Sequence, residues 1–309
     1  GVKVTLFEKE DKMGGVVRNV IPGFRISDSA IDNDVKLVAA MGVEMVNGRE
    51  ITDIEALKKD YDYVVLAVGA SEQGRLKLEA GDTMNALDFL ARFKATDGKV
   101  ELGKNVVVIG GGNTAMDTAR AAKRNAGVEK VSLVYRRTRR YMPADEEELV
   151  MAVEDGVEFA ELLAPVKLEQ GVLYCKRMVL GDLDDSGRRS VVETDQVVEV
   201  PADTVIAAVG EKVPGAFYEN CGIALDSRRR PQVNQETLET SVKGVYVAGD
   251  GLYGPATVVE GIRDGKMAAE AIVGKALAED LFRLSDADAI YGRKGRLAEE
   301  NDQIVDSTR

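Results

Sequence analysis

Apolar and polar positions along the chain follow two periods that alternate with each other. Short runs of apolar residues, several of them closing on glycine, are typical of strands that are buried in a parallel sheet. We predict such strands at residues 1–9, 63–70, 106–109, 130–135, 202–210 and 240–250. Helical apolar spacing predicts helices at residues 31–41, 54–59, 86–93, 115–123 and 146–155, and one that begins at 256–259. This alternation of strands and helices predicts the α/β fold class.

Three further strands are predicted outside this alternation. Residues 44–46 form a short strand candidate. Residues 166–180 and 190–200 alternate between apolar and polar positions on either side of the turn residues 184–187. Two such segments around a polar, glycine-containing turn predict a β-hairpin.

The most informative stretch is the glycine run that follows the strand at 106–109. Gly110, Gly112 and Ala115 form the pattern G-x-G-x-x-A between a strand and a helix, which is the context of a dinucleotide-binding fingerprint. Glycine lets the backbone approach a pyrophosphate closely, and the helix N-terminus directs N–H groups and positive dipole toward it. An ordinary tight turn is the alternative interpretation.

The end of the next strand indicates which dinucleotide is bound. An NAD site usually carries an acidic residue there, whereas this strand ends in Arg136 and Arg137. Guanidinium groups suit the 2′-phosphate of NADP(H). The sequence therefore predicts an NADP(H) site, with a solvated basic patch as the alternative.

Composition restricts the function further. The 309 residues are 45% apolar and 30% charged, which is ordinary for a globular protein that is long enough for two domains. Because the net charge is −12, we expect no nucleic-acid partner. The chain contains no histidine, so Ser-His-Asp and Cys-His catalysis and histidine metal sites are excluded. Cys175 and Cys221 lie far apart, which favours reduced thiols over a redox disulfide or a metal cage.

We expect a cytoplasmic protein without a membrane span. No apolar run approaches 18 residues, and the N-terminus shows no charged-then-apolar leader. The strand at 1–9 resembles the second strand of a nucleotide-binding βαβ unit, with Glu8 placed to take ribose hydroxyls. The first strand, its glycine loop and its helix would precede residue 1, so we expect an N-terminally truncated fragment. An edge strand with an exposed Glu8 is the alternative.

Several motifs together carry a family resemblance. They are Phe7-Glu8-Lys9, Gly14-Gly15, Ile21-Pro22, the strand at 64–70, the loop at 110–117, Tyr135-Arg136-Arg137-Thr138, Met142-Pro143-Ala144, Ala208-Val209-Gly210 and the segment 244–250. With them the chain resembles the small-subunit family of glutamate synthase over about residues 1–275. This NADPH- and FAD-binding module also occurs in dihydropyrimidine dehydrogenase and in iron–sulfur subunits of selenate reductase. The tail at 291–295 is most similar to the selenate reductase subunits.

The resemblance implies two Rossmann-like, three-layer dinucleotide-binding domains, with the NADPH domain inserted into the FAD domain. The implied organisation is residues 1–95 as the first FAD segment, which lacks its first βαβ half, 96–212 as the NADP(H) domain, 213–278 as the second FAD segment, and 279–309 as a linker or tail. The link from 71 to 82 is short for the family.

The resemblance also assigns roles to residues. Arg140 would join Arg136 and Arg137 around the adenosine phosphate, and Asp250 would hold the flavin ribitol or cap the following turn. The helix N-terminus at Thr257 and Val258 would lie near the flavin N1–O2 edge. The residues assigned to cofactor binding are Glu8, Lys9, Gly14, Gly15, Arg18, Gly69, Gly110, Gly111, Gly112, Asn113, Thr114, Arg136, Arg137, Arg140, Ala208, Val209, Gly210, Gly249, Asp250, Thr257 and Val258.

These assignments predict an electron-input module. Hydride would pass from NADPH to FAD, and electrons would continue to iron–sulfur clusters in another domain or a partner subunit, because this chain has no cysteine cluster. No side chain is predicted to act as a catalytic acid or base, and no metal ligand is predicted. The alternative is a non-catalytic NADP(H)-binding fragment that does not retain FAD. A disulfide reductase is disfavoured because no C-x-x-C motif is present, and a flavin-dependent RNA-modifying protein fits the charge poorly.

Overall fold

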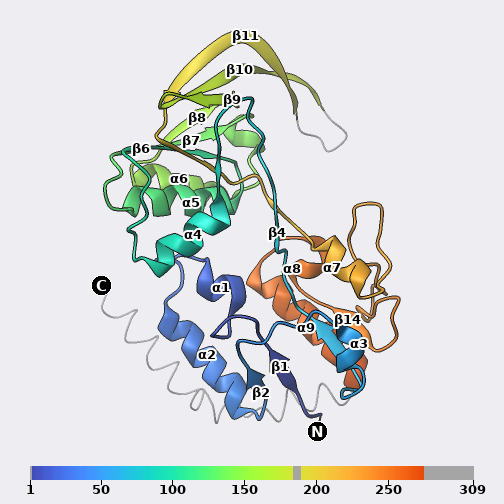
Figure 1. The fold of residues 1–309 in the computed structure, drawn as a ribbon. Helices are drawn as coiled ribbons and strands as arrows, with labels where there is room; N and C mark the ends of the chain where they lie inside the picture. Colours follow the sequence, from blue (N-terminus) through green and yellow to red (C-terminus); the bar gives the residue numbers. More distant parts are fainter. Residues whose placement is uncertain (1, 184–188, 275–309) are drawn as a thin grey trace, which may run out of the picture. The chain divides into compact units, whose positions relative to one another are not determined.

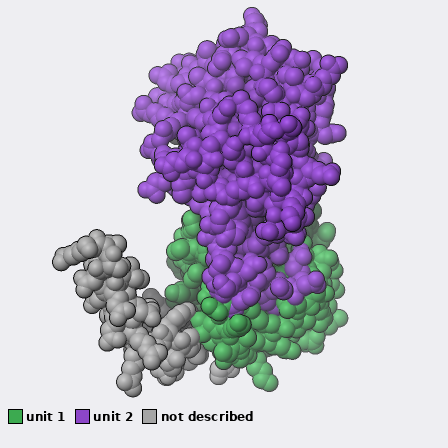
Figure 2. Space-filling view, turned by 90° about the vertical axis from the view of Figure 1, so that its left-hand side faces the viewer, with its two compact units in different colours: residues 1–9, 33–69, 213–309 green, residues 10–32, 70–212 purple. Residues whose placement is uncertain are grey.

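The computed structural model describes residues 2–183 and 189–274, and it divides into two compact units (Figure 2). Unit 1 contains residues 1–9, 33–69 and 213–309, and unit 2 contains residues 10–32 and 70–212. Unit 2 is therefore inserted twice into the chain of unit 1. Residues 10–32 and 70–95, assigned from sequence to the FAD-binding domain, belong to the same compact unit as the predicted NADP(H) domain.

Unit 2 is built on a five-stranded parallel sheet (Figure 1). Its order is β5 (Met84–Asn85), β12 (Thr204–Ala207), β6 (Asn105–Ile109), β7 (Lys130–Tyr135) and β8 (Glu158–Glu161). The sequence β8-β7-β6-β12 corresponds to the 3-2-1-4 order of a Rossmann half. The α/β prediction and the predicted strands at 106–109 and 130–135 are confirmed.

The residues of β6 alternate between two hydrophobic layers. Val106 and Val108 pack with the helices α4 (Ala86–Ala95), α5 (Asn113–Arg124) and α6 (Glu146–Glu154). Val107 and Ile109 pack instead with residues of an antiparallel sheet on the other face. Burial on both faces explains why this strand is continuously apolar.

The antiparallel sheet has the order β11-β10-β9, and it comprises β9 (Leu163–Glu169), β10 (Val172–Leu183) and β11 (Arg189–Pro201). The prediction of one strand over 166–180 was wrong. Gln170 and Gly171 both have positive φ, 50° and 77°, and this turn separates β9 from β10. The predicted turn at 184–187 lies outside the described residues.

The predicted helices of unit 2 are confirmed with small differences at their ends. Asn85 caps α4 by accepting the N–H groups of Leu87 at 2.8 Å and of Asp88 at 3.4 Å. The buried face of α5 consists mainly of alanine, which allows close packing on the sheet. Unit 2 also contains α1 (Gly15–Asn19), a 3-10 turn (Arg139–Tyr141), and the short antiparallel pair β4 (Glu72–Gln73) and β13 (Glu211–Lys212).

Unit 1 contains two separate parallel strand pairs. β1 (Thr5–Phe7) pairs with β2 (Glu44–Val46), and β3 (Val64–Leu66) pairs with β14 (Val245–Val247). Its other elements are α3 (Ile54–Leu57), α7 (Gly215–Asn220), α8 (Asp250–Tyr253) and α9 (Val258–Val273), together with most of α2 (Asp28–Ala40), whose first residues belong to unit 2. The core of unit 1 includes Tyr218, Val245 and Leu252.

The predicted tail at 279–309, including the segment 291–295, lies outside the described residues. Within the described part of the chain, no helix is both long and apolar enough to cross a membrane.

A charged cluster joins α5 to the end of α6. Asp155 accepts a hydrogen bond from Arg120 Nε at 2.6 Å and a bidentate pair from Arg124 at 2.6 and 2.8 Å. The ring of Phe24 lies 5.1 Å and 4.5 Å from these two guanidinium carbons. These interactions attach the segment before α2 to the helices that cover the sheet.

We predict that Asp155→Asn lowers the free energy of unfolding by about 2 kcal/mol at pH 7, because charge-assisted hydrogen bonds are lost. Arg124 and Arg120 hold the pKa of Asp155 below its usual value in the folded protein. Because the pKa of Asp155 is lower in the folded protein, its carboxylate stabilises the fold at pH values above its unfolded-state pKa of about 4. This stabilisation is lost as the pH falls through the folded-state pKa. The difference between the variant and the unsubstituted chain should therefore shrink toward acid in urea unfolding. Asp195→Asn, an exposed site on β11, is the control. A difference independent of pH would contradict this account.

Candidate functional site

The glycine loop after β6 adopts a conformation that requires glycine at its first position. Gly110 has φ of +155°, and a Cβ atom there would lie 2.4 Å from the carbonyl oxygen of Ala208. Ala208 in turn donates its N–H to the carbonyl of Ile109 at 2.8 Å. The carboxyl ends of β6 and β12 are thereby held side by side. In open α/β sheets, ligands bind at this edge.

The N-terminus of α5 is open to a ligand. Its N-cap residue is Gly112, and no side chain caps it. Asn113 is exposed and Thr114 is half-buried in the first turn. The first N–H groups and the helix dipole are thus available to an anion, as a pyrophosphate site requires.

The arginine segment, residues 136–145, follows β7 and contacts this loop through the hydrogen bond from Ala144 N–H to the carbonyl of Gly111. Arg136 and Arg140 are exposed, and neither forms a hydrogen bond or an ion pair with the residues that the structure describes. Arg137 is half-buried, and its Nε donates to the carbonyl of Arg189 at 3.1 Å, which ties it to β11. Arg136 and Arg140 are therefore the two cations of this segment with the greatest freedom to meet a phosphate.

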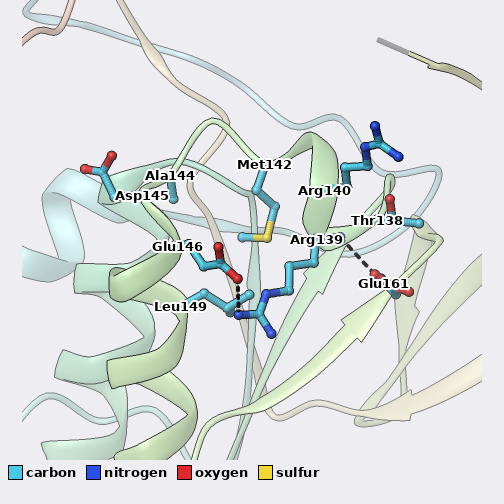
Figure 3. A pocket seen from close by; sticks show the side chains of 9 residues that line it. All are labelled: Thr138, Arg139, Arg140, Met142, Ala144, Asp145, Glu146, Leu149 and Glu161. Carbon is cyan, nitrogen blue, oxygen red and sulfur yellow. Dashed lines mark hydrogen bonds and ion pairs between the residues drawn. The ribbon is translucent and has the colours of Figure 1, made fainter. Parts of the chain in front are cut away.

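A cavity of about 630 Å³ lies beside this segment (Figure 3). Its lining consists of Thr138, Arg139, Arg140, Met142, Ala144, Asp145, Glu146, Leu149 and Glu161. Arg139 is neutralised by Glu146 at 2.6 Å, and its backbone N–H donates to Glu161 at 2.9 Å. Arg140 points away from the Arg139–Glu146 pair (Figure 3). The roles of Arg139 and Glu161 are not evident from the sequence, because they depend on contacts between distant segments.

The residues assigned to flavin from sequence are divided between the two units. Gly14, Gly15 and Arg18 belong to unit 2, whereas Glu8 and Asp250 belong to unit 1. Arg18 is buried and donates to the carbonyl of Met13 at 2.5 Å and to Asp32 at 2.7 Å. Its guanidinium group therefore organises the local backbone.

Asp250 follows β14 and caps a turn in this structure. It accepts the N–H of Ala256 at 3.1 Å. Burial raises the pKa of the Asp250 carboxyl, and the nearby charges of Glu260 and Asp264 act in the same direction. Asp264 is itself buried and accepts the N–H of Gly249 at 3.3 Å. The turn that carries Asp250 is thus held from both sides.

The helix N-terminus at α9 differs from that of α5. Thr257 accepts the N–H of Glu260 at 3.3 Å, and Glu260 accepts the N–H of Thr257 at 2.9 Å. In this capping box the chain's own side chains satisfy the N–H groups of Thr257 and Glu260. Val258 is exposed, as are Val209 and Gly210 after β12, and Gly69 after β3 is half-buried.

A comparison with family models identifies the chain. Residues 1–265 match the model of the family described as pyridine nucleotide-disulphide oxidoreductase. The chain belongs to this family.

Curated relatives show which proteins the chain resembles. It is 42% identical over 283 residues to YgfK of Escherichia coli (strain K12), which is named as an oxidoreductase. This match covers 89% of this chain but only 27% of that protein. The chain is 34% identical over 312 residues to the glutamate synthase [NADPH] small chain of Azospirillum brasilense, over 90% of this chain and 63% of the relative. It is also 34% identical over 316 residues to the NADPH-Fe(3+) oxidoreductase subunit beta of Geobacter sulfurreducens (strain DL-1 / KN400), over 88% and 46%. The chain thus spans about a quarter to two thirds of these relatives.

The solved structure of Mycobacterium tuberculosis FprA in complex with NADPH has the same fold. The TM-score is 0.70 at 19% identity, and the match covers 90% of this chain and 79% of that one. This likeness confirms the predicted Rossmann-like α/β fold.

We predict that alanine destabilises the protein at one glycine of this loop and has almost no effect at another. Gly110→Ala should lower the free energy of unfolding by about 1–3 kcal/mol, because its Cβ would overlap a backbone carbonyl. Gly112→Ala should change it by less than about 0.5 kcal/mol, because φ is −97° and the nearest atom to an added Cβ is 3.9 Å away. Urea unfolding of both variants tests this, and equal stability would contradict the loop geometry.

Proposed function

We propose that this chain is the NADPH-oxidising flavin module of a larger iron–sulfur enzyme. In this proposal it binds NADPH and FAD, hydride passes from the nicotinamide to the flavin, and electrons continue to iron–sulfur clusters in other parts of the enzyme. Positioning of the two cofactors would supply the catalysis, so no side-chain acid or base is needed.

The observation that carries the proposal is the uncapped N-terminus of α5 beside two arginines that have no partner within residues 2–183 and 189–274. Two kinds of phosphate in one ligand fit this arrangement: a pyrophosphate at Gly110–Gly112, and a 2′-phosphate at Arg136 and Arg140. Asn113 and Thr114 would add first-turn donors. Arg137 would act at the edge of the same group, since it is also tied to β11.

The remaining assignments concern FAD. Glu8, with Lys9 beside it, would bind the adenosine ribose, and Gly14-Gly15 would let the backbone approach the flavin. Asp250 would exchange its bond with the Ala256 N–H for the ribitol hydroxyls. Gly69, Gly249, Thr257, Val258 and the segment 208–210 complete the assigned residues.

The partner is inferred from relatives. One is a small chain of glutamate synthase, and another is the beta subunit of an NADPH-Fe(3+) oxidoreductase. In these two relatives and in YgfK, the match to this chain covers only part of the protein. We infer that clusters carried by another domain or subunit receive the electrons. Selenate is the acceptor to assay first, because the tail resembles selenate reductase subunits.

Disulfide reduction, which the family description includes, does not fit these cysteines. The chain has two, both buried, with one in each unit. Burial raises the pKa of Cys175 to about 11 and that of Cys221 above its usual value. Both thiols stay protonated at neutral pH, whereas disulfide exchange needs a thiolate.

We predict that the chain prefers NADPH to NADH and that Arg136→Ala reduces this preference. A charge-assisted hydrogen bond contributes about 1.5–3 kcal/mol, so NADPH affinity should fall at least roughly tenfold while NADH affinity is kept. Calorimetric dissociation constants test this, with Arg228→Ala, an exposed arginine of unit 1, as the control. Equal constants for both nucleotides in the unsubstituted chain would refute the NADPH assignment.

The second candidate is a non-catalytic NADP(H)-binding fragment. Its support comes from unit 1, where the described strands form only two-stranded sheets and Val4, Leu6 and Val65 are exposed. We propose that a further strand covers these apolar residues in the parent enzyme and carries part of the FAD site.

We therefore predict that the purified chain binds NADPH stoichiometrically but holds FAD below one equivalent. Flavin absorbance after gel filtration in excess FAD measures the occupancy. Stoichiometric yellow protein would exclude the fragment hypothesis, and Asp250→Ala should then lower flavin content while circular dichroism stays unchanged.

A further inference from the structure

We propose that Tyr135 is a positioning residue for NADPH specificity. It would set the arginine segment at the correct distance from the pyrophosphate loop without touching the phosphate itself. This inference rests on the proposed NADPH site.

The ring of Tyr135 packs directly against the glycine loop. Tyr135 is the last residue of β7, its ring is buried, and a Cβ atom at Gly111 would lie 2.5 Å from that ring. The loop backbone therefore lies directly against the ring, and only glycine fits at position 111. The height of the loop above the sheet is set by this aromatic side chain.

The hydroxyl group of the same side chain reaches the arginine segment. It donates to the carbonyl of Tyr141 at 2.8 Å, one residue after Arg140. One rigid side chain thus contacts the loop through its ring and the segment through its hydroxyl. Because a tyrosine side chain has only two main torsions, little freedom remains between the two contacts.

Two further hydrogen bonds connect the arginine segment to the glycine loop and the start of α5. Ala144 donates its N–H to the carbonyl of Gly111 at 3.0 Å, and Asp145 donates its N–H to Asn113 Oδ1 at 3.3 Å. These bonds fix the far end of the segment, whereas the Tyr135 hydroxyl fixes its middle. Arg136 and Arg140 have no partners among the described residues, so the backbone that carries them must supply their placement.

The pyrophosphate and the 2′-phosphate of NADPH would therefore be recognised by two different parts of the site. The adenosine ribose joins the pyrophosphate of NADPH to its 2′-phosphate and limits the separation of the two groups, so a displaced segment weakens mainly the second contact. NADH has no 2′-phosphate and is insensitive to that displacement. Loss of the hydroxyl should therefore change the ratio of the two affinities.

The test is Tyr135→Phe in the full chain, with NADPH and NADH as calorimetric probes. The phenylalanine ring keeps the packing contact with Gly111, and only the hydrogen bond to the carbonyl of Tyr141 is lost. We expect NADPH affinity to fall about twofold to tenfold, NADH affinity to stay within twofold, and the thermal midpoint to stay within a few degrees. Tyr135→Leu, which removes the ring as well, should weaken both nucleotides. Tyr174→Phe removes a hydroxyl from the antiparallel sheet of the same unit and is the matched control.

The outcomes are distinct. An unchanged NADPH-to-NADH ratio in Tyr135→Phe, in a chain that prefers NADPH, would overturn this inference and leave the proposed function intact. Equal loss for both nucleotides would reduce Tyr135 to a structural role and would also overturn it. No preference in the unsubstituted chain would overturn the proposed function and this inference together.

Discussion

The structure of the candidate site depends on one close approach between two backbone segments. The carbonyl of Ala208 lies where a side chain of residue 110 would begin, so the ends of β6 and β12 meet without any intervening group. The hydrogen bond from Ala208 N–H to Ile109 continues the sheet to this point. The chain must therefore leave the sheet directly after Ile109, and α5 begins with its N–H groups at the edge of the sheet. A side chain at this place would separate the strands and turn the helix away from a bound anion.

The sheet that supports this loop is covered by different layers on its two faces. Helices cover the face with Val106 and Val108, and the antiparallel sheet covers the face with Val107 and Ile109. The second layer also reaches the site, because β11 accepts a hydrogen bond from Arg137. The antiparallel sheet therefore has two effects: it buries the second face of β6 and restrains one arginine of the segment.

The sequence predicted those parts of the fold whose cause is local. Continuous apolar runs identified β6 and β7, and the glycine pattern identified the loop and the start of α5. The turn at Gln170 and Gly171 was missed because β-forming residues lie on both sides of it, at 166–168 and 172–175, and a single glycine is a weak turn signal. The role of Tyr135 was also missed. A tyrosine at the end of an apolar strand is ordinary by itself, and its meaning comes from Gly111 and Tyr141 packed against it in space.

The two helix N-termini that the sequence analysis assigned to cofactors differ in how they are capped. At α9, the side chains of Thr257 and Glu260 form a capping box that satisfies two N–H groups and stabilises the helix start in the free protein. At α5, Gly112 supplies no cap, and the first turn remains short of hydrogen-bond acceptors. An uncapped turn costs stability in the free protein, and a bound pyrophosphate recovers it because its oxygens accept the same N–H groups. In the proposed site the pyrophosphate would therefore contact α5, and α9 would act on a flavin through its dipole and the shape of its first turn.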